Sequence, residues 1–277
     1  MSFPICSLHQ LGWRTRYAHD LTLDDFAAGH PARVVAVQRG QCSVLSSHGP
    51  GTAALPEHAA GAEAGFAAGD WLLLEHRSGR VLRRLERQSL LAGAVTDGSH
   101  PWSPIAANLD TLFVVTACDA DFNAARLQRY LALAFGARVT PVVVMTKADR
   151  CADAPSWLAT AQRLLPQARV LLVNARERAS VAQLEPWLAP GSTVALVGST
   201  GVGKGSLVRH WLGDAEGVSC EHDALAKPVG MRPSMRPLRT GAWVIDTPDL
   251  RALCARMAGS LRSRESIRVP TQVAGPW

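Results

Sequence analysis

A glycine-rich loop that ends in lysine places the strongest constraint on how this chain folds. Residues 198–204, Gly-Ser-Thr-Gly-Val-Gly-Lys, directly follow the apolar run 194–197 and precede a segment with helical character. A strand, a glycine-rich turn and a helix in this order form a phosphate-binding loop, in which backbone N–H groups and the helix N-terminus face the phosphates. We therefore expect the following residues to bind phosphate: Gly198, Ser199, Thr200, Gly201, Val202, Gly203, Lys204, Gly205 and Ser206.

A second short motif, Thr146-Lys147-Ala148-Asp149, follows the apolar run 141–145. A carboxylate in this place can accept hydrogen bonds from both the amino group and the ring N–H of guanine, a pair that adenine does not offer. A buried acceptor left unpaired costs about 1 to 3 kcal/mol, which is how such a site would reject adenine. We interpret Thr146, Lys147 and Asp149 as guanine-binding, together with Asn174 and Ala175 one strand later.

The two motifs stand in an unusual order along the chain. In ordinary GTPases the phosphate loop precedes the base-selecting segment, whereas here residues 146–149 precede residues 198–204. This order indicates a circularly permuted GTPase domain. Asp246, which follows the apolar run 243–245, occupies the place where a carboxylate would hold Mg²⁺ through water.

Between residues 105 and 253 the sequence alternates short apolar runs with amphipathic segments, a pattern that predicts an α/β fold with a mostly parallel sheet. One segment, 122–136, carries Leu127, Leu131 and Phe135 at four-residue steps, which predicts an amphipathic helix. Ligands of parallel sheets bind at the carboxyl ends of the strands, where both motifs fall. The expected strands are 112–115, 141–145, 169–173, 194–197 and 243–245, and the expected helices are 122–136, 156–165 and 181–188.

The region from about 32 to 92 has a different sequence pattern, which predicts about five short strands separated by turns. Clear examples are 33–37, 42–45, 71–75 and 80–82. The pattern fits a small β-barrel of the oligonucleotide-binding (OB) type, and it fits a small β-domain without a ligand equally well. Both interpretations stay open from the pattern alone.

Composition limits the classes of partner and compartment. The chain of 277 residues is 47% hydrophobic and 19% charged, has no apolar run of about 20 residues, and has a formal net charge of +6. We expect a cytoplasmic protein without a membrane partner, and a polyanion, nucleic acid first, as the charge-matched partner. The arginines at 80, 83, 84 and 87 fit either phosphate contacts or an ordinary charged face. Six cysteines without paired spacing predict reduced thiols rather than disulfides or a zinc site.

From about Arg33 to Arg251 the chain resembles the circularly permuted, ribosome-small-subunit-dependent GTPases, the RsgA/YjeQ family. The resemblance rests on the nucleotide motifs, on Asp246-Thr247-Pro248, and on the stretches 69–71, 107–110, 121–123 and 129–131. It implies an OB-fold barrel, a permuted P-loop GTPase domain and a C-terminal zinc domain. It also implies GTP hydrolysis, with Mg²⁺ as cofactor, in late maturation of the small ribosomal subunit and in contact with its rRNA.

On this resemblance we expect an N-terminal extension at 1–31, the barrel at 32–92 and the GTPase domain at 105–253. The remaining segment, 254–277, contains an arginine-rich stretch at 260–268, which is typical of a solvated, disordered end.

Four departures from the family pattern bear on activity. Gly205 stands where the family has a Ser or Thr whose hydroxyl binds Mg²⁺, and Asp249 replaces a glycine that approaches the γ-phosphate. Residues 230–234, Gly-Met-Arg-Pro-Ser, lack the His and Thr of the corresponding family stretch, and the zinc ligands expected after Cys254 are missing. We expect a weakened Mg²⁺ site, no zinc and slow or absent turnover, and we assign no catalytic residue.

Two other functions are compatible with these motifs. The chain fits a degenerate, non-hydrolysing module of the same fold that only binds nucleotide or RNA. A P-loop ATPase is the other alternative, and competition of ATP against GDP distinguishes it from a guanine-specific protein.

Overall fold

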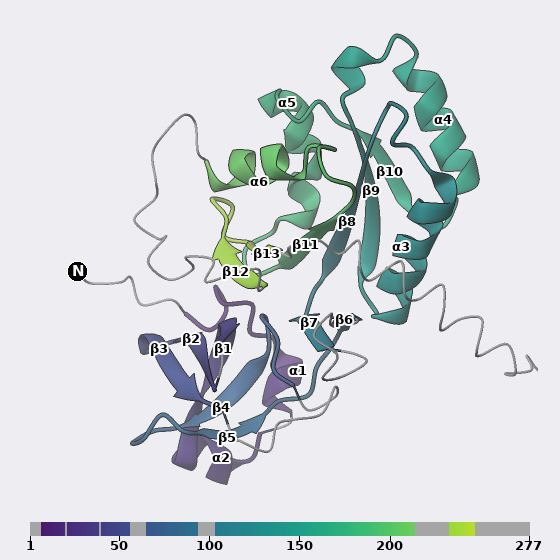
Figure 1. Cartoon of the computed structure of the whole chain (residues 1–277). Helices are drawn as coiled ribbons and strands as arrows, with labels where there is room; N and C mark the ends of the chain where they lie inside the picture. Colours follow the sequence, from purple (N-terminus) through teal and green to yellow (C-terminus); the bar gives the residue numbers. More distant parts are fainter. Residues whose placement is uncertain are drawn as a thin grey trace, which may run out of the picture.

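The computed structural model describes residues 7–19, 21–38, 40–55, 65–93, 103–213 and 233–246. Several predictions concern residues outside these ranges: Asp249, residues 230–232, the positions where zinc ligands would fall, and the segment 254–277. Within the described ranges, no helix combines the length and hydropathy that crossing a bilayer requires. Figure 1 shows the arrangement of the elements.

The described residues form helices and strands in an order that changes from mainly β to alternating β and α. The strands are β1 (Gly29–Gln38), β2 (Gln41–Ser46), β3 (Gly49–Ala54), β4 (Trp71–Glu75), β5 (Val81–Arg84), β6 (Leu90–Gly93), β7 (Ser103–Ala107), β8 (Thr111–Ala117), β9 (Thr140–Thr146), β10 (Arg169–Leu172), β11 (Thr193–Val197), β12 (Ser234–Pro237) and β13 (Trp243–Asp246). The helices are α1 (Thr15–Ala18), α2 (Leu23–Ala28), α3 (Ala124–Gly136), α4 (Ala154–Leu164), α5 (Arg178–Val181) and α6 (Lys204–Leu212), with 3₁₀ turns η1 (Ala148–Arg150) and η2 (Ala182–Trp187).

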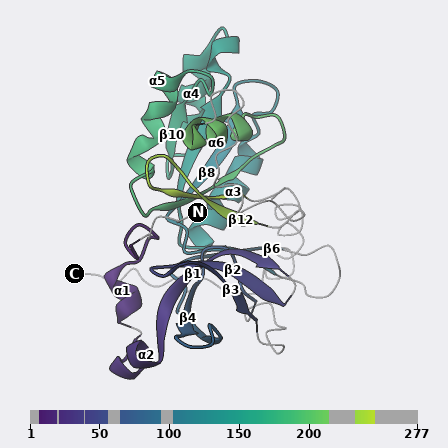
Figure 2. The same ribbon diagram turned by 90° about the vertical axis from the view of Figure 1, so that its left-hand side faces the viewer.

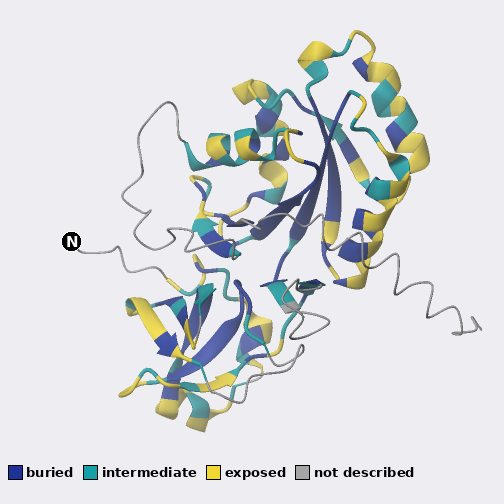
Figure 3. Cartoon of the chain, in the orientation of Figure 1, coloured by how far each residue is buried: buried dark blue, intermediate teal, exposed yellow. Residues whose placement is uncertain are grey.

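The strands β10, β9, β8, β11 and β13 pair in parallel in that order, and we call them the parallel block. The central strand β8 is buried along its whole length, as is β11 (Figure 3). A strand covered on both faces needs apolar side chains at successive positions, which is why these strands appear as continuous apolar runs in the sequence.

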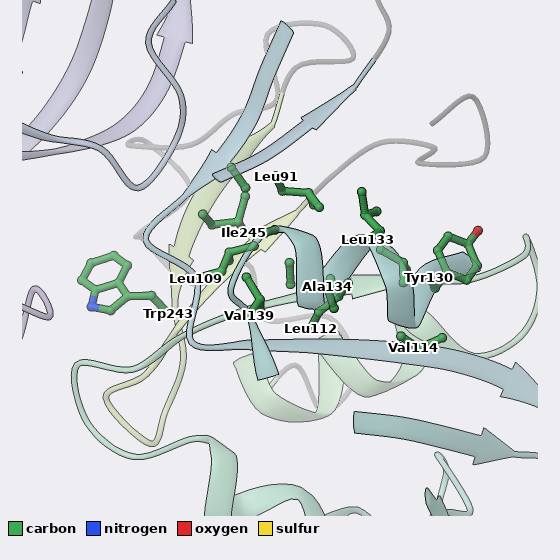
Figure 4. Close-up of a cluster of buried hydrophobic side chains, with 14 of the residues drawn as sticks. Leu91, Leu109, Leu112, Val114, Tyr130, Leu133, Ala134, Val139, Trp243 and Ile245 are labelled. Carbon is green, nitrogen blue, oxygen red and sulfur yellow. The ribbon is translucent and has the colours of Figure 1, made fainter. Parts of the chain in front are cut away.

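Side chains of β8 point alternately to the two faces of the sheet. Leu112 and Val114 belong to a cluster that includes residues of α3 and α4, whereas Phe113 and Val115 belong to a second cluster with residues of η2 and α6. Figure 4 shows part of the first cluster, where α3 packs on β8 and β6 and β13 contribute further apolar side chains. Helices therefore cover both faces of the parallel block, as the alternating sequence pattern predicts.

The strands β3, β2, β1, β4 and β5 pair antiparallel in that order, and we call them the N-terminal block. They confirm the prediction of about five short strands in this region. A small apolar cluster lies between them, and its buried members are Ala32, Val34, Cys42, Val44, Ala53, Leu72 and Leu74.

The second half has the mostly parallel pairing that was predicted, and it continues into the N-terminal block as one sheet, which the sequence did not predict. Strand β12 pairs antiparallel with β13 on one side and with β1 on the other, where Ala36 lies opposite Ser234. The two views in Figures 1 and 2 place β12 between the blocks. Among the described strands of this sheet, the pairings from β10 to β13 are parallel and the others are antiparallel. The four residues of β12, Ser-Met-Arg-Pro, contain no apolar run, so no sequence pattern indicates this strand.

The prediction of a helix at 181–188 was wrong in part. Residues 181–188 form the end of one α-turn and a 3₁₀ turn, because Pro186 has no N–H to continue an α-helix. The amphipathic helix predicted at 122–136 forms as α3, in which Leu127 and Leu131 are buried and Phe135 is 48% exposed. Each four-residue step advances about 40° around a helix of 3.6 residues per turn, so a stripe at this spacing leaves the buried face by its third member.

Residues 7–19, predicted as part of an extension, lie at the junction of the two blocks. The Gln10 carbonyl accepts a hydrogen bond from the Trp243 indole N–H of β13 at 2.8 Å, and Arg14 pairs with Asp110 at 2.6 Å. Gly12 has φ +86°, and a Cβ there would collide with the Gly191 carbonyl and the Arg33 guanidinium. This position therefore requires glycine.

Arg33 on β1 connects the junction to the parallel block. Its side chain donates to the Leu11 carbonyl and, at 2.7 Å, to the Thr193 hydroxyl at the start of β11. Arg33 is 2% exposed, and its guanidinium lies 5.6 Å from the centre of the Trp71 ring. Burial lowers the pKa of Arg33 to about 10, so the group stays charged at neutral pH.

We expect Arg33→Ala to lower the free energy of unfolding by about 2 to 5 kcal/mol, because it opens a cavity and leaves the Thr193 hydroxyl and the Leu11 carbonyl without this donor. Urea unfolding measures the change. The control is Arg77→Ala, an exposed arginine in the β4–β5 turn, for which we expect a change within about 0.5 kcal/mol. Equal losses in the two variants would contradict the structural role of Arg33.

Candidate nucleotide site

The glycine-rich loop connects β11 to α6, as predicted from the sequence. Gly198 is buried and has φ +147°, and a Cβ at this position would collide with the Val115 carbonyl of the neighbouring strand β8. Only glycine allows the chain to leave β11 so close to β8. The loop ends at Gly203, which has φ +101° and precedes the first turn of α6.

Lys204 is the first residue of α6, where the helix dipole adds positive charge to that of the side chain. Its ammonium donates to the carbonyls of Gly198 at 2.7 Å and Ser199 at 2.8 Å. The Lys204 ammonium thus lies against the start of the phosphate loop. Thr200 and Gly201 at the tip of the loop are exposed, whereas Ser199 and Val202 are buried.

Thr146, the last residue of β9, brings the base-selecting segment against the phosphate loop. It is fully buried, and its hydroxyl contacts two carbonyls, that of Val202 in the loop and that of Thr116 on β8, the latter at 3.1 Å. A Cβ built on Gly203 would lie 3.5 Å from the Thr146 methyl carbon. The two motifs that are far apart in sequence therefore touch.

Lys147 follows with a left-handed backbone conformation, φ 60° and ψ 30°. Its ammonium forms an ion pair with Asp119 at 3.0 Å. Asp119 was not among the predicted site residues. It follows the carboxyl end of β8 by two positions, so the rule that ligands bind at this edge of a parallel sheet could have pointed to it.

Asp149 lies in the 3₁₀ turn η1, and its side chain is 34% exposed. The Arg150 guanidinium lies 3.9 Å from one of its oxygens, and the Arg150 side chain is 59% exposed. An ion pair of this length between exposed groups contributes less than about 1 kcal/mol. The carboxylate is therefore accessible to a base that enters the site.

Asn174 and Ala175 follow β10, the neighbour of β9, and both are half-buried. The Asn174 side-chain oxygen accepts a hydrogen bond from the Arg176 backbone N–H at 3.1 Å, and its own backbone N–H donates to the Ser180 hydroxyl at 2.8 Å. These bonds fix the loop beside the base-selecting segment. The structure thus places residues 146–149, 174–175 and 198–204 at one edge of the sheet.

The positions proposed for Mg²⁺ are less complete. Gly205 is exposed, and a Cβ built there would meet no atom within 4 Å. Ser206 lies on α6, with its hydroxyl 3.5 Å from the Arg209 guanidinium. Asp246 ends β13, which runs parallel to β11. Within the described ranges, no three His, Cys, Asp or Glu side chains are grouped so as to hold a metal ion.

We expect Gly198→Ala to lower the free energy of unfolding by about 3 kcal/mol, because the methyl group collides with the Val115 carbonyl at a φ that L-residues avoid. The matched control is Gly201→Ala, where φ is +79° but no atom lies within 4 Å of the added carbon. Its cost should be about 1 kcal/mol. Urea unfolding of both variants separates collision from backbone strain, and equal losses would contradict the close approach to β8.

Comparisons with known proteins agree with this geometry. The family model described as RsgA GTPase matches residues 84–255. A protein of Mesorhizobium japonicum named small ribosomal subunit biogenesis GTPase RsgA is 41% identical, over 89% of this chain and 72% of the relative. A protein of Vibrio vulnificus named small ribosomal subunit biogenesis GTPase RsgA 2 is 37% identical, over 89% of this chain and 70% of the relative.

Two solved structures share the fold at 18% sequence identity. The crystal structure of YjeQ from Thermotoga maritima aligns with a TM-score of 0.59 over 79% of this chain and 74% of that one. The structure of YloQ, described as a circularly permuted GTPase, aligns with a TM-score of 0.58 over 81% and 73%. Taken with the site and with the two relatives above, these matches show that the chain belongs to the RsgA GTPase family.

Proposed function

We propose that this protein binds GTP and GDP at the loops that follow β9, β10 and β11, and that it acts in late maturation of the small ribosomal subunit. The relatives described above are named small ribosomal subunit biogenesis GTPases, which supports this proposal. The observation that carries the proposal is the hydrogen bond from the Thr146 hydroxyl to the Val202 carbonyl, because it joins the base-selecting segment to the phosphate loop.

In this proposal the phosphates lie against the backbone amides of residues 198–206 and the N-terminus of α6. Lys204 exchanges its contacts with the Gly198 and Ser199 carbonyls for the β- and γ-phosphates. At the other end, Asp149 accepts hydrogen bonds from the guanine ring, and Lys147, Asn174 and Ala175 complete the base pocket.

Hydrolysis in such a site is an in-line attack of water on the γ-phosphate, in which positioning and charge stabilisation supply the catalysis. Asp249 would place a negative charge beside the γ-phosphate. Two like charges about 4 Å apart repel by about 1 kcal/mol even when well screened. We propose slow turnover and a preference for GDP on this ground.

Magnesium is the cofactor that membership of the family implies. The residues at hand fit the ion poorly, because Gly205 has no side-chain oxygen and the Ser206 hydroxyl lies one helix position away, about 100° around α6. Asp246 is the carboxylate proposed to hold the ion through water. No step of the proposed hydrolysis is therefore assigned to the metal, and we propose that the protein binds no zinc.

The N-terminal block is proposed to be an OB-fold barrel, spanning 32–92, that contacts rRNA. Its strand order is compatible with a partly open five-stranded barrel. Three of the four arginines considered above make contacts within the protein: Arg83 with Asp25, Arg84 with the Gly65 carbonyl, and Arg87 with Asp70. The exposed side chains of Arg77 and Arg80 are better placed for phosphates, and binding through them would weaken with salt.

The remaining boundaries are proposed as before: an N-terminal segment at 1–31, the GTPase domain at 105–253 and a basic tail at 254–277. Because small ribosomal subunits mature in the cytoplasm, we propose that the protein acts there and has no membrane partner.

A titration with GDP, GTP and ATP, with Mg²⁺ and with a chelator, tests nucleotide binding. We expect GDP to bind about fivefold more tightly than GTP, which corresponds to the repulsion of about 1 kcal/mol from Asp249. We also expect chelation to change the GTP affinity less than about twofold, because Gly205 supplies no ligand. ATP should compete poorly against labelled GDP, and equal affinities for ATP and GDP would favour the P-loop ATPase instead.

A double substitution, Gly205→Ser with Asp249→Gly, tests whether the departures from the family pattern limit hydrolysis. Open space around Gly205 allows the serine to fit without collision. We expect the double variant to hydrolyse GTP at least about tenfold faster in the presence of small ribosomal subunits, which corresponds to 1.4 kcal/mol of barrier. An equally fast parent chain would refute the proposed effect of these departures. No detectable turnover in either protein would favour the non-hydrolysing module.

A further inference from the structure

Lys147 holds a backbone conformation that its residue type disfavours. Its φ of 60° and ψ of 30° lie in the left-handed region, directly after β9 and before η1. A side chain other than glycine keeps such a conformation only where its surroundings impose it. The turn carries Asp149 two residues further on, so whatever stabilises Lys147 also sets the position of that carboxylate.

The ammonium of Lys147 is fixed by Asp119, which is itself fixed from a second side. One Asp119 oxygen accepts from Lys147 Nζ at 3.0 Å, and the other accepts from the Asp121 backbone N–H at 2.8 Å. The Asp121 N–H and, after it, the Lys147 ammonium hold the pKa of Asp119 below its ordinary value. The carboxylate is therefore ionised at neutral pH and cannot rotate without losing a bond.

The backbone on the N-terminal side of Lys147 is attached to the same loop. The Thr146 carbonyl accepts from the Cys118 backbone N–H at 2.9 Å, and the Thr146 hydroxyl contacts Thr116. On the other side, the Lys147 carbonyl accepts from the Arg150 backbone N–H at 3.0 Å. Main-chain bonds thus fix both ends of the turn, and the ion pair fixes the side chain between them.

We propose that Asp119 is a positioning residue for guanine selection: it holds Lys147 in the left-handed turn that presents Asp149 to the base. The inference rests on the proposed guanine-nucleotide function, because Asp119 acts through residues assigned to the base pocket. The nearby Asp121 does not duplicate this role, since its carboxylate pairs with Arg126 at 2.9 Å and accepts from the Thr116 hydroxyl.

Asp119→Asn is the decisive substitution, because the amide oxygen can still accept from the Asp121 N–H while the charge facing Lys147 is lost. We expect GDP affinity to fall about five- to tenfold, whereas the weaker ADP affinity stays within about twofold. Isothermal titration with GDP and with ADP measures the ratio of the two affinities. A loss of general structure would lower both affinities, and thermal unfolding of the variant monitors it independently.

Two further proteins complete the test. Asp24→Asn removes one exposed carboxylate from α2, outside the site, and should leave both affinities unchanged. In a Lys147→Ala background, Asp119→Asn should cost no additional GDP affinity, because its partner is absent.

The outcomes separate this inference from the function on which it rests. If the parent chain prefers GDP over ADP but Asp119→Asn leaves that preference intact, the role of Asp119 is wrong and the proposed function stands. An equal loss of GDP affinity with and without Lys147 also overturns the inference. A parent chain that binds GDP no better than ADP overturns the proposed function and the inference together.

Discussion

Parallel pairing of β8 with β9 and β11 is the constraint on which the site depends. Because parallel strands end at the same edge of a sheet, the loops after residues 117, 146 and 197 meet there, although some eighty residues of chain separate the first from the last. Continuous burial of β8 makes this register difficult to shift, since both faces of the strand are covered by helices. A one-residue change in register would move each side chain of β8 to the opposite face of the sheet.

The base end of the proposed site has more of the expected side chains than the phosphate end. The base end has a network of contacts in which Thr146, Lys147 and Asp119 join three loops. The phosphate end keeps its glycines and Lys204, yet at Gly205 it lacks the hydroxyl that would complete a metal site. On the proposed function, such a site would select the base more strictly than the number of phosphates.

Much of the fold and of the site follows from the sequence, for reasons that differ between elements. Strands buried on both faces, such as β8 and β11, are visible in the sequence as apolar runs. The glycine spacing of the loop at 198–204 occurs in few other structures. Strand β12 gives no such signal, because its pairing is imposed by β1 and β13 from either side. Asp119 was missed because an acidic residue after a strand is common, and only the fold shows which lysine it faces. Arg33 was assigned to a strand, but no pattern could reveal a burial that depends on residues 7–19.

The contacts of Arg33 indicate where mutations that impair the protein can fall. From the Leu11 carbonyl, a short path of contacts runs through the Arg33 guanidinium to Thr193, and β11 continues from there to the first glycine of the loop. Gly12, which tolerates no side chain, lies beside that path. Loss-of-function mutations should therefore also occur within the first dozen codons. This stretch carries no recognisable motif, so its mutations would otherwise be taken as neutral.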